Sequence, residues 1–374
     1  MSATGGPAGR LTYAAAGVDT EAGDKAVELM KDAVRATHGA RVVGGVGGFA
    51  GLYDASLLSR YRQPLLATST DGVGTKVAIA QAMDKHDTIG FDLVGMVVDD
   101  IVAVGATPLF MTDYIACGRV VPERIADIVR GIAEACQAAG TALVGGETAE
   151  HPGLLGPDEY DVAGAVTGVV EADGVLGPEK VRSGDVVVAL ASSGLHANGF
   201  SLVRKVVELA GWSLDRHVAE FGRTLGEELL EPTHVYSAEV LAMIERAAGG
   251  VHAVSHVTGG GLAANLARVL PAGLVAGVDR SSWSVPPVFD VVRTLGDVPW
   301  SDLERTLNLG VGMIAVVDAQ VANGVLAHAS ELGLGAWVLG EVDDIDRARA
   351  VEDLVSGTKG VHAGAVAMTG RYRT

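Results

Sequence analysis

The sequence predicts an α/β protein with two domains. Its 374 residues exceed the usual size of one domain, about 100 to 200 residues, so each half can hold its own core. Hydrophobic residues make up 48% and charged residues 20%, which is typical of a folded globular chain. The 51 glycines cluster where short apolar strands are expected to pass into helices, which favours ligand-binding loops over linkers. We place the two domains at residues 21–171 and 172–345, between a mobile segment 1–20 and a flexible tail 346–374.

The charge balance limits the possible partners. The chain carries 28 Lys and Arg residues against 46 Asp and Glu residues, a net charge of −18. Such a surface repels nucleic acid and anionic membranes, so a phosphorylated substrate must be met by local donors, helix N-termini or bound cations. Cys117 and Cys136 have no metal-type spacing and fit a reducing compartment. The first ten residues lack the apolar segment of a signal peptide, and no apolar run reaches the roughly 18 residues of a membrane span. We therefore expect a cytoplasmic protein.

The first elements are a helix and a glycine-rich loop. Apolar residues recur at helical spacing over residues 21–36, and Asp19 or Thr20 can cap that helix. The run at 44–51 follows, and it includes Gly47, Gly48 and Phe49. Its glycines are too flexible for a strand interior. Two interpretations stay open, a plain loop and a lid over phosphates.

A short strand at 64–68 leads into the segment Ser-Thr-Asp-Gly-Val-Gly-Thr-Lys at 69–76. The segment places Asp71 at the strand tip and Lys76 a few residues later, with glycines that let a ligand approach the backbone. This combination suits a metal-bound nucleotide, although the spacing differs from that of a Walker loop. A simple turn is the alternative.

A helix at 88–105 carries an apolar stripe that contains Asp100. A carboxylate on a buried stripe needs a partner, because an unpaired buried charge costs several kcal/mol. Asp99 lies about 100° away around the helix and is expected to be exposed.

Acidic residues recur near glycines and strand ends. Asp113 falls in a strand at 109–116, a helix follows at 122–139, and a strand at 141–144 ends in a glycine pair before Glu147. Asp71, Asp100, Asp113 and Glu147 thus lie on separate elements. Hard oxygen ligands of this kind suit Mg²⁺, which binds through one or two carboxylates plus substrate phosphates. A cap or surface turn is the alternative for each carboxylate taken alone.

The second domain repeats one arrangement twice. Strands at 185–191 and 251–256 are followed by glycine-containing loops at 192–199 and 258–261, and each loop enters a helix. Free backbone N–H groups at a helix N-terminus can bind phosphate. His196 and His256 lie in or beside these loops, where an imidazole can move a proton near neutral pH. Tight packing without a ligand and a structural histidine remain the alternatives. Strands are also predicted at 314–317 and 336–339, and a helix at 321–332.

Taken in order, these motifs resemble a known enzyme family. They are Gly47-Gly48-Phe49, the segment 70–76, the segment 145–150, Ser192-Ser193-Gly194 with His196 and Asn198-Gly199, and Thr258-Gly259-Gly260-Gly261. Their order and spacing over residues 12–342 resemble the phosphoribosylformylglycinamidine cyclo-ligases, also called aminoimidazole ribonucleotide synthetases. The resemblance implies an ATP- and Mg²⁺-dependent ring closure in purine biosynthesis. It also implies an N-terminal domain that builds a β-barrel across a homodimer, and a C-terminal domain with a mixed sheet flanked by helices.

The resemblance also implies roles for individual residues. Those implied to bind metal are Asp71, Asp100 and Glu147. Those implied to bind ATP or substrate are Gly47, Gly48, Phe49, Gly72, Gly74, Thr75, Asn198, Gly259 and Gly260. Those implied to be catalytic are His196, Lys76 and His256, with Lys76 near the phosphates and His196 as the first choice for proton transfer.

Some positions depart from the pattern of that family. Ala14-Ala15 stand where it has Lys-Asp, and Asp99 where it has Asn. His151, Leu195 and Ala267 replace Met, Pro and Pro. Rival interpretations are a thiamine-monophosphate kinase, a selenophosphate synthetase, a hydrogenase-maturation dehydratase and a non-catalytic nucleotide-binding regulator. The kinase is disfavoured by the segments 145–150 and 192–199, and the selenophosphate synthetase by the lack of a reactive Cys in the N-terminal segment. The regulator is disfavoured because the candidate carboxylates and Lys76 are all present.

Overall fold

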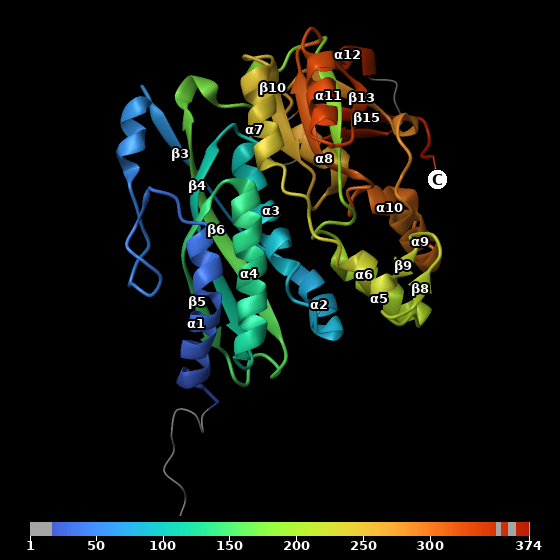
Figure 1. Cartoon of the computed structure of the whole chain (residues 1–374). Helices are drawn as coiled ribbons and strands as arrows, with labels where there is room; N and C mark the ends of the chain where they lie inside the picture. The colour runs from blue at the N-terminus through green and yellow to red at the C-terminus, as the bar shows by residue number, and fades with distance from the viewer. Residues whose placement is uncertain (1–16, 349–352, 358–363, 374) are drawn as a thin grey trace, which may run out of the picture.

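A computed structural model describes residues 17–348, 353–357 and 364–373, which fold around two large β-sheets (Figure 1). The first part of the chain contains α1 (Thr20–Ala36), β1 (Val42–Val43), β2 (Leu52–Tyr53), η2 (Ala55–Arg60), β3 (Pro64–Gly72), η3 (Gly74–Lys76), α2 (Val77–Met83), α3 (Ile89–Val102), β4 (Thr107–Cys117), α4 (Pro122–Ala139), β5 (Ala142–Glu150) and β6 (Tyr160–Glu171).

The second part begins with two short 3₁₀ turns and continues as a larger sheet with its helices. Its elements are η4 (Ala172–Gly174), η5 (Pro178–Lys180), β7 (Val186–Ala191), α5 (Phe200–Ala210), β8 (His217–Val218), β9 (Arg223–Thr224), α6 (Leu225–Leu229), α7 (Ser237–Arg246), β10 (Val251–His256), α8 (Gly261–Arg268), β11 (Leu274–Asp279), η6 (Arg280–Ser282), α9 (Pro287–Gly296), α10 (Trp300–Glu304), β12 (Val311–Val317), α11 (Ala322–Glu331), β13 (Ala336–Asp344), α12 (Ile345–Ala348), β14 (Leu354–Ser356) and β15 (Ala365–Thr369).

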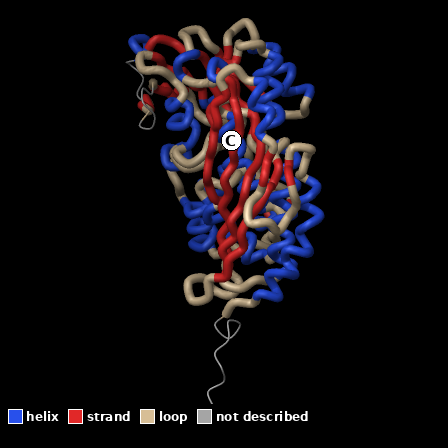
Figure 2. Tube along the Cα trace, turned by 90° about the vertical axis from the view of Figure 1, so that its left-hand side faces the viewer, coloured by secondary structure: helices blue, strands red, loops and turns tan. Residues whose placement is uncertain are grey.

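The smaller sheet has four strands in the order β3-β6-β4-β5 and is covered by α-helices on one face. Val162, Val166 and Val170 of β6 are buried beneath these helices, whereas the residues between them are mostly less buried, as the period of two in a strand requires. α1, α3 and α4 lie on that side (Figure 1). Figure 2 looks onto the strands from the opposite side, where they face the viewer. Leu66 and Tyr114 are 62% and 41% exposed on the strands of this sheet.

The larger sheet has seven strands in the order β10-β12-β7-β13-β11-β15-β14. Its central strands β7 and β12 are almost wholly buried, which explains their continuous apolar sequence. β15 joins the sheet by parallel pairing with β11 and by antiparallel pairing with β14. The prediction of a flexible tail at 346–374 is therefore wrong for the described part of that segment. Val366 and Met368 are 0% and 4% exposed in the core of this sheet.

This correction gives a stability prediction for the C-terminal strand. Met368→Ala is expected to lower the free energy of unfolding by about 2–5 kcal/mol, because it removes a buried side chain and leaves a cavity. Denaturant unfolding of both proteins measures the change. Leu354→Ala, at a position on the edge strand β14 that is 38% exposed, serves as the control with a small effect. If Met368→Ala and the parent protein had equal free energies of unfolding, the original prediction of a flexible C-terminal tail would be favoured.

The start of the chain agrees with most of the local predictions. α1 begins at Thr20, and the Asp19 side chain accepts hydrogen bonds from the N–H groups of Glu21 and Ala22. Of the predicted mobile segment 1–20, residues 1–16 lie outside the described residues. β3 runs through Gly72, so Asp71 lies within the strand and not beyond its tip. The proposed domain boundaries stay predictions.

The burial of the two adjacent aspartates on α3 is the reverse of the prediction. Asp99 is 0% exposed, and both of its carboxylate oxygens accept from the Tyr236 N–H at 3.1 Å. Burial raises the pKa of Asp99 to about 7, although the charge of His256 opposes this shift. The Asp100 side chain is 41% exposed. The sequence pattern did not reveal which side of α3 is buried. The reason is that α7, which comes much later in the chain, covers the side of α3 that carries Asp99.

Candidate functional site

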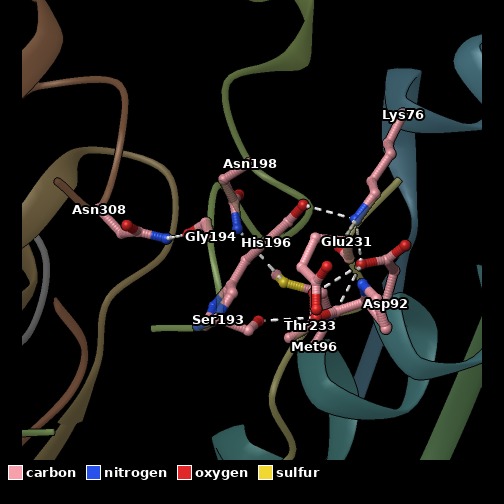
Figure 3. Close-up of polar contacts among 11 residues, drawn as sticks. Lys76, Asp92, Met96, Ser193, Gly194, His196, Asn198, Glu231, Thr233 and Asn308 are labelled. Atoms are coloured by element: carbon pink, nitrogen blue, oxygen red, sulfur yellow. Dashed lines mark hydrogen bonds and ion pairs between the residues drawn. The ribbon is translucent and has the colours of Figure 1, made fainter. Parts of the chain in front are cut away.

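Two glycine-rich loops of the second sheet approach the end of β3 and one side of α3. The first loop, residues 192–199, joins β7 to α5 and is held by side chains around it. Asn308 Nδ2 donates to the Gly194 carbonyl at 2.9 Å, and Ser192 Oγ donates to the same carbonyl at 2.9 Å. The loop is therefore fixed in shape. Figure 3 shows the Asn308–Gly194 contact on one side of the loop and Lys76 with Asp92 on the other.

Lys76 is completely enclosed and connects both parts of the chain. Its Nζ atom donates to Asp92 Oδ1 at 2.7 Å, to the His196 carbonyl at 3.0 Å and to the Glu231 carbonyl at 2.6 Å (Figure 3). Burial lowers the pKa of Lys76 and raises the pKa of Asp92, while the contact between the two opposes both shifts. All three ammonium donors are used within the protein. Lys76 Nζ thus has no donor left over for a phosphate in this geometry, and the implied contact stays a prediction.

Asp92 is the residue that the motif analysis missed. It is fully buried, and its Oδ1 atom also accepts from the backbone N–H and the hydroxyl of Thr233, at 3.1 and 2.6 Å. Asp92 and Asp99 are seven residues apart, so they lie on one side of α3 and both receive donors from the segment that leads into α7. That spacing of two acidic residues on an apolar helix was the signal available in the sequence.

His196 is buried rather than placed at a surface. It is 2% exposed, its backbone has a positive φ of 60°, and its Nε2 atom accepts from the Ser193 N–H at 3.2 Å. Burial, together with the charges of His256 and Lys76, lowers the pKa of His196 well below its ordinary value. The ring is therefore neutral near pH 7. Its expected role in proton transfer stays a prediction.

His256 instead contacts an accessible carboxylate. Its Nδ1 atom lies 3.0 Å from Asp100 Oδ1, and Ser69 Oγ donates to Asp100 Oδ2 at 3.3 Å. Asp71 is two residues beyond Ser69 on the same face of β3, about 7 Å along the strand. Asp71 and Asp100 therefore flank one place where β3, α3 and the end of β10 come together.

The two glycine-rich loops are tied to each other at the same place. Asn198 Oδ1 accepts from the Gly259 N–H at 3.1 Å, and Asn198 Nδ2 lies 3.3 Å from the sulfur of Met96 on α3. Gly260, with a φ of +102°, is the N-cap of α8, a conformation that favours glycine. The hydroxyl oxygens of Thr75 and Ser201 are 3.1 Å apart, which links the 72–76 segment to the start of α5. Asn198 thus ties the two loops together, and Thr75 contacts the helix that follows the first loop.

Glu147 does not join this group within one chain. Asp71, Gly164, Asp113 and Gly146 lie in register across the four strands, so β6 and β4 separate β3 from β5. Glu147 is the next residue after Gly146 and points to the other face. Among the described residues, no three His, Cys, Asp or Glu side chains are close enough to hold a metal ion. The expected three-carboxylate site is therefore not formed within the described chain, whereas Asp71 and Asp100 lie near one another.

Glu147 lines a second hollow instead, with the glycine run. A cavity of about 580 Å³ lies between α1, β5 and the loop at 44–51. Gly47, Gly48 and Phe49 all line it, and Phe49 is fully exposed. The sequence-predicted residues thus fall into two sets, one where β3 and α3 meet the two glycine-rich loops and one at this cavity.

Comparison with known proteins decides among the rival families. Residues 52–170 match the family described as AIR synthase related protein, N-terminal domain, and residues 182–352 match the corresponding C-terminal domain. A phosphoribosylformylglycinamidine cyclo-ligase of Alkaliphilus oremlandii (strain OhILAs) is 45% identical over 334 residues, 89% of this chain and 97% of that protein. One from Geobacillus sp. (strain WCH70) is 48% identical over 331 residues, 88% of this chain and 95% of that protein. The chain belongs to the phosphoribosylformylglycinamidine cyclo-ligase family.

The likeness to a solved structure says less about function than the family match does. The crystal structure of the hydrogenase maturation protein HypE in complex with ATP has a TM-score of 0.58 and 18% identity, covering 93% of this chain and 91% of that one. At that identity the likeness shows a shared fold alone. No helix of the described chain is long and apolar enough to span a membrane. The two family matches coincide with the two sheets, so the predicted two-domain α/β architecture is confirmed.

Proposed function

We propose that this chain catalyses the ATP-dependent closure of formylglycinamidine ribonucleotide to aminoimidazole ribonucleotide, with release of ADP and phosphate. Membership of the cyclo-ligase family, over both domains of the chain, is the observation that carries this function. The enzyme is thus a ligase of purine biosynthesis that forms a C–N bond. Its buried, unpaired cysteines fit the reducing cytoplasm, where we place the reaction.

The residues where β3 and α3 meet the two glycine-rich loops can supply what phosphoryl transfer requires. That reaction depends on positioning and charge neutralisation more than on covalent chemistry by the protein. Asp71 and Asp100 fit an Mg²⁺ ion, which binds through one or two carboxylates plus phosphate oxygens. When bound, the ion would neutralise charge on the transferred phosphoryl group. Backbone N–H groups at Gly260 and the N-terminus of α8 would bind a phosphate, and Asn198 holds that loop in place.

Proton transfer and positioning are divided among the three residues that the resemblance implies to be catalytic. ATP phosphorylates the amide oxygen of the substrate, the amidine nitrogen attacks the same carbon, and phosphate leaves with that oxygen. We assign the associated proton transfer to His256, because its Nδ1 atom is bonded to the accessible Asp100. Lys76 and His196 act as positioning residues, since Lys76 connects the 192–199 loop to α3. Glu147 and the segment Gly47-Gly48-Phe49 line the cavity that we assign to the nucleotide.

Complementation of a bacterial purine auxotroph tests the function in a cell. A strain without its own cyclo-ligase is expected to grow without added purine when it expresses this chain. Growth must disappear when the Asp71→Asn and Asp100→Asn changes are combined, while the protein level stays the same. Failure of the parent chain to restore growth, despite folded protein in the cell, would contradict the proposal.

We also propose a homodimer in which the open face of the four-stranded sheet is covered by a second copy. The proposal is supported by β3, which is an edge strand of the sheet and on which Leu66 is 62% exposed. An exposed apolar edge strand promotes aggregation unless it is paired or covered. Two such sheets would close a barrel without free edges, as expected for the family.

Sedimentation velocity tests this arrangement. The parent protein is expected to sediment as a species of twice 38.2 kDa. Leu66→Lys is expected to weaken the dimer at least tenfold, because it places a charge in the covered face. Leu209→Lys, at a position on α5 that is 74% exposed, is the matched control and should stay dimeric. A monomeric parent protein would refute the proposal.

A further inference from the structure

The cavity beside α1 has mainly apolar walls and is lined by two carboxylates, those of Asp113 and Glu147. Ala26, Val27 and Met30 of α1 form one wall, and Leu143 and Val144 of β5 form another. The backbone of the loop at 44–51 closes a third side. A volume of about 580 Å³ falls within the range of small-molecule sites. Such walls suit a flat apolar ring, and the few polar groups that face the cavity decide which ring is accepted.

The Asp113 side chain reaches this cavity because its neighbour on β5 is a glycine, which has no side chain. Asp113 and Gly146 are partners in the parallel β4–β5 pairing. A Cβ atom on Gly146 would overlap Asp113 Oδ1, so the carboxylate occupies the space that a larger residue would fill. Both residues line the cavity. The glycine therefore serves to open a path for the Asp113 carboxylate through the edge strand.

The Asp113 carboxylate has no cationic partner within the described chain. Burial raises its pKa to about 7, and its own backbone N–H is the one group that opposes the shift. An unpaired buried carboxylate costs stability, and such groups are concentrated at functional sites. The site is thus built around an acceptor that lacks a donor. The missing donor is expected to come from the ligand.

We propose that Asp113 selects the base of the nucleotide by accepting a hydrogen bond from the exocyclic amino group of adenine. The inference rests on the proposed use of ATP and deepens it. The adenine ring lies between the α1 wall and the glycine-rich loop, with its amino edge toward Asp113. Hypoxanthine and guanine carry a carbonyl oxygen at the same position, and two acceptors facing each other repel. Asp113 is therefore a specificity-determining residue for ATP over ITP.

Steady-state kinetics with ATP and ITP test the assignment. The parent enzyme should use ITP at least tenfold less efficiently than ATP. Asp113→Asn is expected to lower kcat/KM for ATP about 10- to 100-fold, as loss of a hydrogen bond to a charged group predicts. It should also raise the ITP-to-ATP ratio, because an amide can donate to the carbonyl oxygen. Asp127→Asn, on the outer side of α4 where Asp127 pairs with Arg130, is the matched control with no change in the ratio.

Thermal unfolding separates this role from a structural one. Asp113→Asn removes an unpaired buried charge at nearly constant shape, so without nucleotide its Tm should equal or exceed that of the parent protein at pH 8. ATP should raise the Tm of the parent protein, and it should raise that of the variant much less. This readout needs no turnover, so it remains informative even if ring closure itself is not observed.

Three results would overturn the inference. They are an unchanged ITP-to-ATP ratio in Asp113→Asn, equal use of ATP and ITP by the parent enzyme, and a preference of the parent enzyme for GTP. The last would mean that the carboxylate pairs with the N–H groups of guanine. The second and third need no variant, so the inference can fail even if Asp113→Asn does not fold.

Discussion

Asp100→Asn is expected to lower kcat about 10²- to 10³-fold while the fold and the free energy of unfolding change little. The effect on turnover is of the size seen when one electrostatic contact to a transition state is removed. The fold should survive because the Asp100 side chain is 41% exposed and its contacts, Ser69 and His256, can also bond an amide. The loss should be largest at limiting Mg²⁺, since the amide is a poorer ligand than the carboxylate.

Kinetics over a range of Mg²⁺ concentrations measure this prediction. Asp127→Asn, the same chemical change on the outer side of α4, is the control and should leave turnover unchanged. Unaltered kinetics of Asp100→Asn at limiting Mg²⁺ would remove Asp100 from the metal site. A large loss of stability would assign it a structural role instead.

Lys76→Met is expected to lower the free energy of unfolding by about 3–5 kcal/mol, because the change leaves the buried Asp92 carboxylate without its cation. Activity should fall together with the stability, since the His196 and Glu231 carbonyls also lose their shared donor. Denaturant unfolding and steady-state kinetics on the same preparations measure both effects.

A second substitution separates this explanation from a direct role in phosphate binding. Adding Asp92→Asn to Lys76→Met removes the unpaired charge, so it should restore a large part of the lost stability. The stability of Lys76→Met and its KM for ATP are the deciding quantities. Full stability of Lys76→Met combined with a raised KM for ATP would show that Lys76 contacts the phosphates after all.

Local signals in the sequence were sufficient for the glycine-rich loops and for many of the strands and helices beside them. The cap at Asp19, the proline that begins α4 and the glycine turn before α8 all follow from interactions within a few residues. These interactions need no knowledge of distant partners. The positions of the candidate loops could therefore be predicted.

Long-range packing decided the features that the sequence did not reveal. Neither the burial of Asp99 nor that of Lys76 has a local cause, because their partners Tyr236, His196 and Glu231 come from the second part of the chain. Likewise, the short apolar run at 365–369 becomes a core strand through parallel pairing with β11. Periodicity within a single segment carries no information about such partners.

The most direct test of the account is the product balance of the purified protein with formylglycinamidine ribonucleotide, ATP and Mg²⁺. The predicted result is one aminoimidazole ribonucleotide and one phosphate for each ADP formed, with no ADP above background when the ribonucleotide is omitted. ADP formed without aminoimidazole ribonucleotide, or formed equally well with a different acceptor, would contradict the assignment.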